Sequence, residues 1–387
     1  MKCLLDVYHK SLNMVGEELC GDQVRVINSG NKTRAVLCDG LGHGVKANIL
    51  ATLSSEIIIN LLREDVPLPE VFETVIGTLP VDKELNLAYA TSTMIEIDRS
   101  DLTYKVYNFD NPPILFYRKR KLEFLPFRQI LLMDRNVQYS EGALERGDLL
   151  ITMSDGMLQA GIGGVLNPNW DVNRLGAYVE ELFQYLPVNL RLLVDKTVAH
   201  VNQLYDRKPA DDASLLGLLV RAKQGVMLFT GPPVNPDQDR SLSQRILKFE
   251  GTRIVCGGTT GNIVARESGH SGAIDPDTAR LDVPPMSSLP GIDILTEGIL
   301  TLSSVLEWIE ATHGNPNLLP TKDKNGAVLV AEALLDADEI TLVVGLKVNP
   351  AYQNPDLPLS MSIRKNLMEK IADRLAELGK VVSIEFH

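Results

Sequence analysis

Four acidic motifs lie in the first 222 residues of the chain, each beside a short apolar run. They contain Asp22 in CGDQVRV, Asp39 in DGLGHG, Asp155 in MSDGM, and the pair Asp211 and Asp212 in front of ASLLGLLV. An Asp at the end of a buried strand is held by a rigid sheet and can still meet water. If these strands are neighbours, the carboxylates converge on one edge of the core.

Such a cluster suits metal chemistry. Carboxylate and water oxygens, without His or Cys, are the ligands of hard cations such as Mg²⁺ and Mn²⁺. Two ions roughly 3.5–4 Å apart can lower the pKa of a shared water and present it to a phosphorus atom. Gly40 and Gly156 would let the chain turn sharply beside the ions. Gly42 and Gly44 lead into a predicted helix N-terminus, which favours an anion such as phosphate.

Each motif taken singly also has a structural explanation. Asp-Gly is most often a β-turn, Gly-Asp around Asp22 is a common dipeptide, and Asp211 with Asp212 could be a solvated strand entry. The metal hypothesis therefore depends on the joint appearance of all four motifs. His43 could hydrogen-bond a bound water or phosphate, or act as a proton donor, but a residue chosen for helix entry explains it equally well.

Composition excludes several classes of protein. With 44% hydrophobic and 23% charged residues, the chain is globular rather than disordered or fibrous. The formal charge of -12 argues against nucleic-acid partners and anionic membranes. The four Cys form no C-x-x-C pair and are typical of free thiols in a reducing compartment. Without a signal-peptide pattern or an apolar run of roughly 18–20 residues, the sequence predicts a soluble cytoplasmic protein.

The elements that must position the carboxylates follow from the hydrophobic periodicity. Apolar residues at helical spacing predict helices at 45–63, 68–79 and 189–205. In the first helix the residues that recur at this spacing are Ile49, Leu50, Leu53, Ile57 and Leu61. Strands are predicted at 35–38, 91–98, 102–110, 114–117, 122–125, 148–153 and 213–220. A strand-rich core with helices early and late predicts stacked sheets with helices outside.

The chain changes character after the last of these strands. GPPVNPDQD is rich in Pro, Gly and Asp and predicts a linker, assigned to residues 223–240. Alternating strands and helices then predict a smaller α/β domain at 241–387, which could bind a ligand, a partner or a second copy of the chain. GGTTGN at 257–262 could hold phosphate between a strand and a helix. It lacks a P-loop Lys and does not fit G-x-G-x-x-G, so a plain turn is favoured.

The motifs DGLGHG, TSTMIEID, NPPILFYR, LLITMSDG and DDASLLGLLV together resemble the PPM-type metal-dependent protein phosphatases. They are most similar to the bacterial branch named for the stage II sporulation E protein. The resemblance covers about residues 10–222 and implies an α+β fold, an α-β-β-α sandwich in the domain at 1–222. It also implies hydrolysis of phosphoserine or phosphothreonine on a bacterial signalling partner, such as an anti-sigma-factor antagonist-like protein.

The resemblance also implies roles for individual residues. It implies two Mn²⁺ or Mg²⁺ ions held by Asp22, Asp39, the carbonyl of Gly40, Asp155, Asp211 and, less strongly, Asp212. Asp39 would bridge both ions, and Asp39 and Asp155 would act in catalysis through a metal-bound water. The helices at 45–63 and 68–79 would form a regulatory switch. Ser214 stands where Thr is common, a mild departure because both side chains carry a hydroxyl.

Two other functions stay open at this point. The first is a signalling scaffold that keeps the phosphatase fold without activity, against which the presence of all four metal motifs argues. The second is a metal-dependent hydrolase of a small phosphate ester, which a comparison of phosphopeptides with small esters would distinguish.

Overall fold

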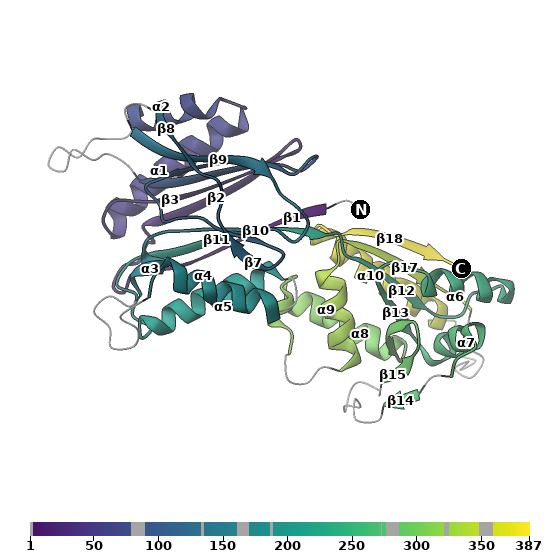
Figure 1. Cartoon of the computed structure of the whole chain (residues 1–387). Helices are drawn as coiled ribbons and strands as arrows, with labels where there is room; N and C mark the ends of the chain where they lie inside the picture. The colour runs from purple at the N-terminus through teal and green to yellow at the C-terminus, as the bar shows by residue number, and fades with distance from the viewer. Residues whose placement is uncertain are drawn as a thin grey trace. The chain divides into compact units, whose positions relative to one another are not determined.

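The computed structural model of this chain describes residues 3–78, 90–132, 135–160, 170–185, 189–271, 273–275, 286–320, 325–347 and 359–387. The chain divides into two compact units, Met1–Ala222 (unit 1) and Lys223–His387 (unit 2) (Figure 1). Unit 1 has two sheets and unit 2 has one, and each unit has its own hydrophobic cores.

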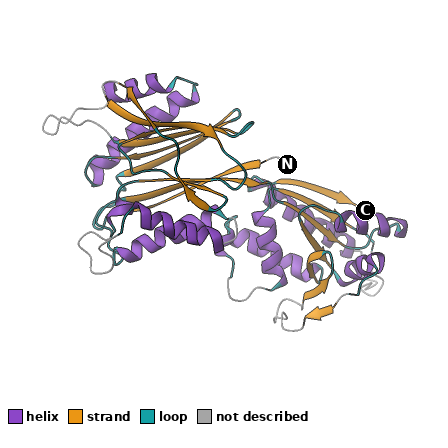
Figure 2. Ribbon diagram, viewed as in Figure 1, coloured by secondary structure: helices purple, strands orange, loops and turns teal. Residues whose placement is uncertain are grey.

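Unit 1 contains two antiparallel sheets (Figure 2). The five-stranded sheet has the order β1 (Cys3–Leu12), β11 (Ala213–Ala222), β10 (Leu149–Met153), β6 (Leu115–Arg118) and β7 (Lys121–Glu123). The six-stranded sheet has the order β2 (Asp22–Ser29), β3 (Lys32–Asp39), β4 (Thr91–Asp98), β5 (Thr103–Phe109), β9 (Arg135–Ala143) and β8 (Arg128–Leu132). The strands predicted from two-residue alternation are confirmed.

The alternation of side chains along β3 shows how the layers form. Ala35 and Leu37 belong to the core between the two sheets, whereas Val36 and Cys38 belong to the core under the helices of the six-stranded sheet. Those helices are α1 (Gly44–Arg63) and α2 (Leu68–Thr78). The five-stranded sheet is covered by α4 (Val172–Tyr185) and α5 (Leu190–Leu204). Unit 1 is therefore an α-β-β-α sandwich, and the predicted fold class is confirmed.

The helices of unit 1 lie close to their predicted positions. Asn189 accepts a hydrogen bond from the N–H of Leu192 and so caps α5 at its predicted start. The last residue of the second predicted helix, residue 79, lies outside the described residues. Helix α4 was not predicted, although its apolar residues recur at helical spacing.

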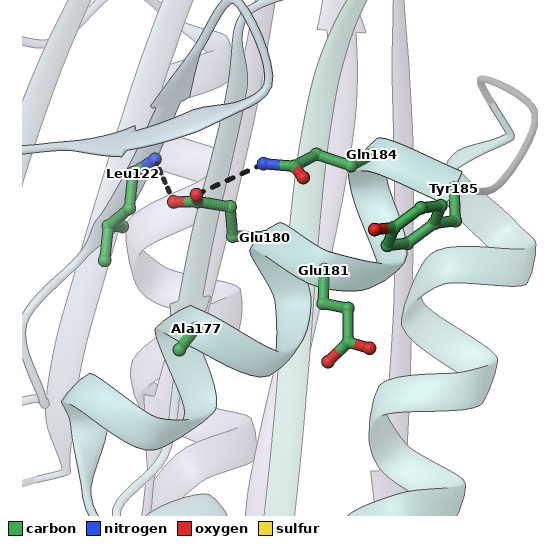
Figure 3. A pocket seen from close by; sticks show the side chains of 6 residues that line it. All are labelled: Leu122, Ala177, Glu180, Glu181, Gln184 and Tyr185. Carbon is green, nitrogen blue, oxygen red and sulfur yellow. Dashed lines mark hydrogen bonds between the residues drawn. The ribbon is translucent and has the colours of Figure 1, made fainter.

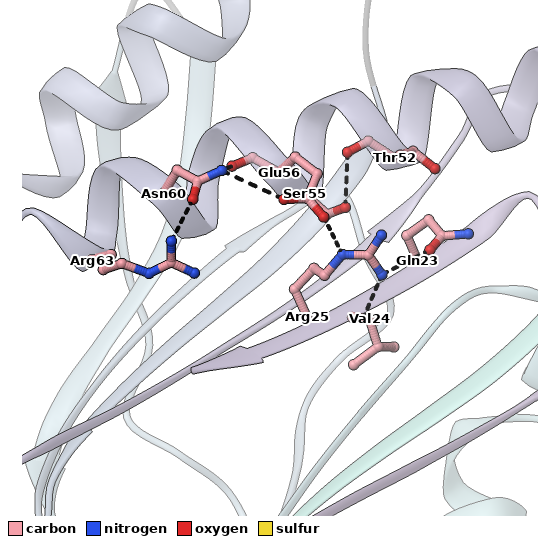
Figure 4. Close-up of polar contacts among 8 residues, drawn as sticks. All are labelled: Gln23, Val24, Arg25, Thr52, Ser55, Glu56, Asn60 and Arg63. Carbon is pink, nitrogen blue, oxygen red and sulfur yellow. Dashed lines mark hydrogen bonds and ion pairs between the residues drawn. The ribbon is translucent and has the colours of Figure 1, made fainter. Parts of the chain in front are cut away.

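Helix α1 is present, and of the five apolar residues that predicted it Leu50 is buried and Ile57 and Leu61 pack against the core. Its buried residues include Ala47, Ala51 and Ser54, small side chains that bring the helix close to β2 and β3. Ile49 and Leu53, which share the predicted spacing, are exposed. The ion pair between Arg25 Nε of β2 and Glu56 Oε1 of α1, 2.7 Å apart, holds this orientation (Figure 4).

By length and composition, α1 is the one helix in the described part of the chain that could cross a membrane. Core helices of water-soluble proteins pass the same test, and the inner face of α1 is buried against the six-stranded sheet.

Residues 223–240 are not a linker, which corrects the prediction from their Pro, Gly and Asp content. They contain β12 (Gly225–Thr230), a short 3₁₀ turn at Pro236–Gln238, and the start of α6 (Asp239–Leu247). The run Val-Met-Leu-Phe in β12 is buried on both faces, as expected for the central strand of a parallel sheet. The Pro-rich segment is the turn that follows this strand.

Unit 2 is a doubly wound α/β domain. Its parallel strands have the order β16 (Ile292–Thr296), β13 (Thr252–Cys256), β12, β17 (Glu339–Val344) and β18 (Val381–Phe386). The short strands β14 (Ala273–Asp275) and β15 (Met286–Leu289) extend one edge in antiparallel pairing. The predicted α/β class of this region is confirmed. Strands β13 and β16 are added on one side of β12, and the later strands β17 and β18 are added on its other side.

Helices cover both faces of this sheet. Apolar residues of α6 and α7 (Gly258–Ser268) pack in one core. Those of α8 (Ile299–Ala311), α9 (Gly326–Asp336) and α10 (Leu359–Glu377) pack in the other. Because α6, α7 and α8 each follow a parallel strand, their N-termini lie at the carboxyl ends of these strands.

Candidate active site

Asp22 and Asp39 lie side by side at one end of the six-stranded sheet. Asp22 is the first residue of β2 and Asp39 the last of β3, and the two are directly opposite in the antiparallel register. On its other side Asp39 faces Thr91, the first residue of β4. Asp22 is 3% exposed and Asp39 is half-buried. The register alone therefore brings together two acids that are separated by a hairpin.

A pair of serines joins this sheet end to the other sheet. Ser154, which follows β10, donates its hydroxyl to Asp22 Oδ2 at 2.7 Å. The N–H of Ser214 in β11 donates to Ser154 Oγ at 2.8 Å. Asp22 Oδ1 is buried and has no hydrogen-bond partner among the described residues. One oxygen of Asp22 is thus fixed across the sandwich, while the other is left without a partner.

Asp155 and Asp211 approach from the five-stranded sheet. Asp155 is exposed and directly precedes the short helix α3 (Gly156–Gln159), and its Oδ2 accepts from Gln159 Nε2 at 2.8 Å. Asp155 lies near enough to Asp39 to raise the pKa of the Asp39 carboxyl. Asp211 is half-buried, and its Oδ1 accepts from the N–H of Asp212 at 2.9 Å. All four predicted motifs therefore meet at one end of the sandwich.

The electrostatics show how strongly these carboxylates interact. Burial, together with the charges of Asp22, Asp155 and Asp211, raises the pKa of Asp39 to about 9. The pKa of Asp211 is raised by burial and then by Asp155. Because each carboxylate disfavours ionisation of its neighbours, positive charge placed among them would stabilise the ionised cluster.

The pKa of Asp22 is also raised by burial and by neighbouring acids, but two serine hydroxyls lower it. Burial raises the pKa of Asp22 most, the charges of Asp212 and Asp211 raise it further, and the net value is about 7. The hydroxyls of Ser154 and Ser214 lower it, because they donate to the ionised form.

Asp212 differs from the other four acids because backbone groups already occupy both of its oxygens. Its Oδ1 accepts from the N–H of Met14 at 2.9 Å, and its Oδ2 accepts from the N–H of Gly21 at 2.8 Å. The side chain is 3% exposed. Asp212 thus fixes the loop that leads into β2 and, through it, the position of Asp22.

Two glycines of the motifs allow close approach of the backbone. A Cβ atom on Gly156 would overlap with the carbonyl oxygen of Asp212, and one on Gly40 would overlap with that of Ala47 in α1. The N–H of Gly40 donates to the Gly21 carbonyl at 3.1 Å. Both glycines are therefore needed for packing at the site, in addition to any role in turning the chain.

His43 lies at the entry to α1 and is largely exposed. Its Nδ1 is 2.7 Å from Glu17 Oε1, and its own side chain does not cap the helix. In this structure His43 therefore links α1 to the loop before β2.

Sequence reasoning did not find the polar network beside these acids. Thr93 of β4 donates to Asn108 Oδ1 at 2.8 Å and receives hydrogen bonds from Asn111 Nδ2 at 3.0 Å and Thr152 Oγ1 at 3.1 Å. Thr91 donates to Asn111 Oδ1 at 2.5 Å. The network ties β4 and β5 to β10 of the other sheet. In the sequence, this network could have been found from the alternating Thr91 and Thr93 and from Asn111, which precedes two prolines.

The donor set fits a hard divalent cation, since it consists of carboxylate oxygens and includes an unpartnered buried one on Asp22. Among the residues that the structure describes, no group of three or more His, Cys, Asp or Glu side chains is already arranged around a single ion position. All four Cys are free thiols, as predicted.

The pocket of about 300 Å³ shown in Figure 3 lies elsewhere, between β7 and α4. Its polar residue Glu180 accepts hydrogen bonds from the N–H of Leu122 at 2.8 Å and from Gln184 Nε2 at 3.2 Å. Glu180 thus serves to attach α4 to the sheet, and the pocket contains none of the predicted site residues.

Comparison with known protein families gives a match within unit 1. The model described as stage II sporulation protein E (SpoIIE) matches residues 29–221. This range includes Asp39, Asp155, Asp211 and Asp212, whereas Asp22 lies seven residues before it (29 minus 22). Among curated proteins, no significant relative of the chain is found.

Several solved structures are similar in fold to part of the chain. The phosphatase domain of SpoIIE from Bacillus subtilis, with a fragment of its regulatory domain, is 18% identical with a TM-score of 0.48. The match covers 57% of this chain and 63% of that one. The RsbU and RsbW domains of a Mycobacterium tuberculosis protein are 16% identical with a TM-score of 0.47, covering 62% and 67%. RsbX in complex with magnesium is 14% identical with a TM-score of 0.40, covering 56% and 95%.

Proposed function

We propose that this chain is a metal-dependent protein serine/threonine phosphatase, since residues 29–221 belong to the SpoIIE family of PPM-type phosphatases. Its substrate would be a phosphoserine or phosphothreonine on a cytoplasmic bacterial signalling partner, such as an anti-sigma-factor antagonist-like protein. The observation that carries the proposal is the convergence of Asp22, Asp39, Asp155 and Asp211 at one end of the sandwich.

These four carboxylates would hold two Mn²⁺ or Mg²⁺ ions, with the carbonyl of Gly40 as a further ligand. Bound there, the ions would supply Lewis-acid stabilisation and an activated water for attack on phosphorus. Asp39 interacts with both Asp22 and Asp155, which supports its assignment as the bridging residue.

The remaining polar groups would position this set. Ser154 holds Asp22 Oδ2, which directs the unpartnered Oδ1 of Asp22 to a ligand. Asp212 acts as a positioning residue, because both of its oxygens already accept backbone N–H groups. His43 would contribute to the entry of α1 through Glu17 rather than to proton transfer.

Exposed apolar side chains near the acids favour a protein substrate over a small phosphate ester. Val15 and Leu19 lie on the segment before β2, and Leu41 directly follows Asp39 and Gly40. Val45, Ile49 and Leu53 lie along one face of α1. Large apolar groups in contact with water are typical of surfaces that bind another protein. The exposed stripe of α1 therefore supports a phosphoprotein substrate.

The proposal is tested by turnover of a phosphoserine peptide and of p-nitrophenyl phosphate with Mn²⁺. Asp39→Asn should lower kcat/KM for both by about 100-fold or more, because it removes the charge that would bridge the ions. Asp101→Asn is the matched control. Asp101 is exposed in the turn after β4, at the other end of that strand from Thr91.

A wild-type protein that binds Mn²⁺ without any turnover would instead support the inactive signalling scaffold. Equal turnover in wild type and Asp39→Asn would contradict the proposed site. A kcat/KM for small phosphate esters well above that for phosphopeptides would support the small-ester hydrolase.

A further inference from the structure

Two helix N-termini meet at the carboxyl edge of the unit 2 sheet. Helix α7 begins directly after β13, and α8 begins just after the neighbouring strand β16. Their N-cap residues, Gly257 and Gly298, are in contact, since a Cβ on Gly298 would lie 3.6 Å from the Cα of Gly257. The positive ends of two helix dipoles therefore face the same part of the sheet edge.

The first turns of these helices are not capped. Neither N-cap makes a side-chain hydrogen bond, and neither first turn contains an acidic residue. The N–H of Gly257 donates to the Thr296 carbonyl at 2.8 Å. Within the described residues, the N–H groups of Gly258, Thr259 and Thr260 have no acceptor. Such a turn is able to receive an anion.

A buried hydroxyl without a partner lies in each first turn. Thr260 and Thr301 are the third residues of α7 and α8, are 1% and 0% exposed, and have no hydrogen-bond partner at Oγ1. Thr260 Oγ1 lies 3.4 Å from the position that a Cβ on Gly257 would take, so it points toward the N-terminal loop. A buried unpaired hydroxyl destabilises the fold, which indicates a use in binding.

A guanidinium lies at the same edge, where the strand order reverses. Arg364 of α10 donates through Nη1 to the carbonyl of Gly345, the residue after β17, at 3.0 Å. It also lies against Gly231, the residue after β12. It is partly buried, and within the described residues no carboxylate pairs with it. Doubly wound sheets bind ligands outside the strand ends at this reversal.

The carboxylate of Glu297 restricts which anions could bind at the first turn of α7. It is exposed between β16 and α8, and its Oε1 lies 3.5 Å from the position of a Cβ on Gly258. A carboxylate there would repel a free phosphate ion but can accept hydrogen bonds from sugar hydroxyls.

We propose that this edge of unit 2 binds a phosphate ester that carries sugar hydroxyls, such as a nucleotide. The phosphate contacts the first turn of α7, the Thr260 hydroxyl donates to it, and the N-terminus of α8 and Arg364 add positive charge. Glu297 accepts from the hydroxyls. This site is separate from the phosphatase chemistry of unit 1 and does not depend on it.

The test uses calorimetric titration of the full chain with ADP, adenosine and inorganic phosphate. EDTA is present so that divalent ions at unit 1 contribute no binding. ADP should bind, adenosine should not, and inorganic phosphate should bind more weakly than ADP. Thr260→Val should lower ADP affinity by about 10-fold or more, through loss of a hydrogen bond to a charged group. Its melting temperature without ligand should be unchanged or higher.

Ser243→Ala is the matched control, because Ser243 also has a buried hydroxyl without a partner but belongs to the second turn of α6 and not to the first turn of α7 or α8. It should leave ADP affinity unchanged. Glu297→Gln should weaken ADP and strengthen inorganic phosphate. The proposal is overturned if neither ADP nor phosphate binds, if Thr260→Val binds ADP as wild type does, or if phosphate binds more tightly than ADP.

Discussion

At the scale of single residues, the site depends on contacts between groups far apart in the chain. Asp22 reaches Ser154 across 132 positions, and Asp212 reaches the N–H of Gly21 across 191. Each acid could be selected from the sequence because it stands at the end of an apolar run. Which acid keeps a free oxygen could not be predicted, because it depends on loops brought together only in the folded sandwich.

Gly156 gives a prediction at this scale. Gly156→Ala would place a Cβ against the Asp212 carbonyl, so we expect a loss of roughly 2–4 kcal/mol in the free energy of unfolding. Urea denaturation of unit 1 fluorescence measures the loss. Gly77→Ala in α2 is the control, because no atom lies within 4 Å of its Cβ position and Ala favours helix. Equal midpoints for both variants would contradict the packing role.

At the scale of elements, periodicity predicted most of unit 1 and erred where a helix packs through small residues. Helix α1 was placed correctly, but the small residues Ala47, Ala51 and Ser54 are buried beside Leu50 and Ile58, while Ile49 and Leu53 stay in contact with water. Helix α9 was missed because its sequence is apolar nearly all round and shows little helical contrast. Strand β12 was missed because the Pro-rich turn after it dominated the composition.

The exposed stripe of α1 predicts how substrates are distinguished. Ile49→Ser combined with Leu53→Ser should raise the KM for a phosphoprotein substrate by about 10-fold or more, through loss of apolar contact area. The kcat/KM for p-nitrophenyl phosphate should stay the same, because the acids are untouched. Steady-state kinetics with both substrates provide the measurement. An equal loss of kcat/KM for both substrates would contradict a role in protein recognition and would show that the stripe supports the acidic site itself.

The packing of α4 on α5 predicts a pH dependence of stability. His200 of α5 stacks on Tyr178 at 4.1 Å and contacts the edge of Trp170 at 5.4 Å between ring centroids. Burial lowers the pKa of His200 below 6.5. The unfolded chain then binds more protons than the folded one, so this stability is present above about pH 6.5 and is lost as the pH falls below it.

His200→Phe keeps the ring stacking and removes this titration. Thermal melts between pH 7.5 and 5 should show a smaller fall in melting temperature for the variant than for wild type. An equal fall in melting temperature for wild type and variant would mean that His200 does not contribute to the pH dependence of stability.

At the scale of the whole molecule, the two units have different architectures, each with its own hydrophobic cores. The SpoIIE family match ends at residue 221, one position before the boundary between the units, and the doubly wound unit 2 lies outside it. The resemblance carried by five motifs was sufficient to predict the sandwich of unit 1. No motif of comparable specificity marks unit 2, whose strand order emerges only from the pairing of its strands.

The central claim is that four carboxylates from both sheets of unit 1 hold divalent cations. It is tested most directly by an anomalous difference map from crystals of the full chain grown with Mn²⁺. We expect two peaks among Asp22, Asp39, Asp155 and Asp211, with Asp39 in contact with both. A map in which manganese is absent from this cluster, or binds only at other sites, would contradict the account.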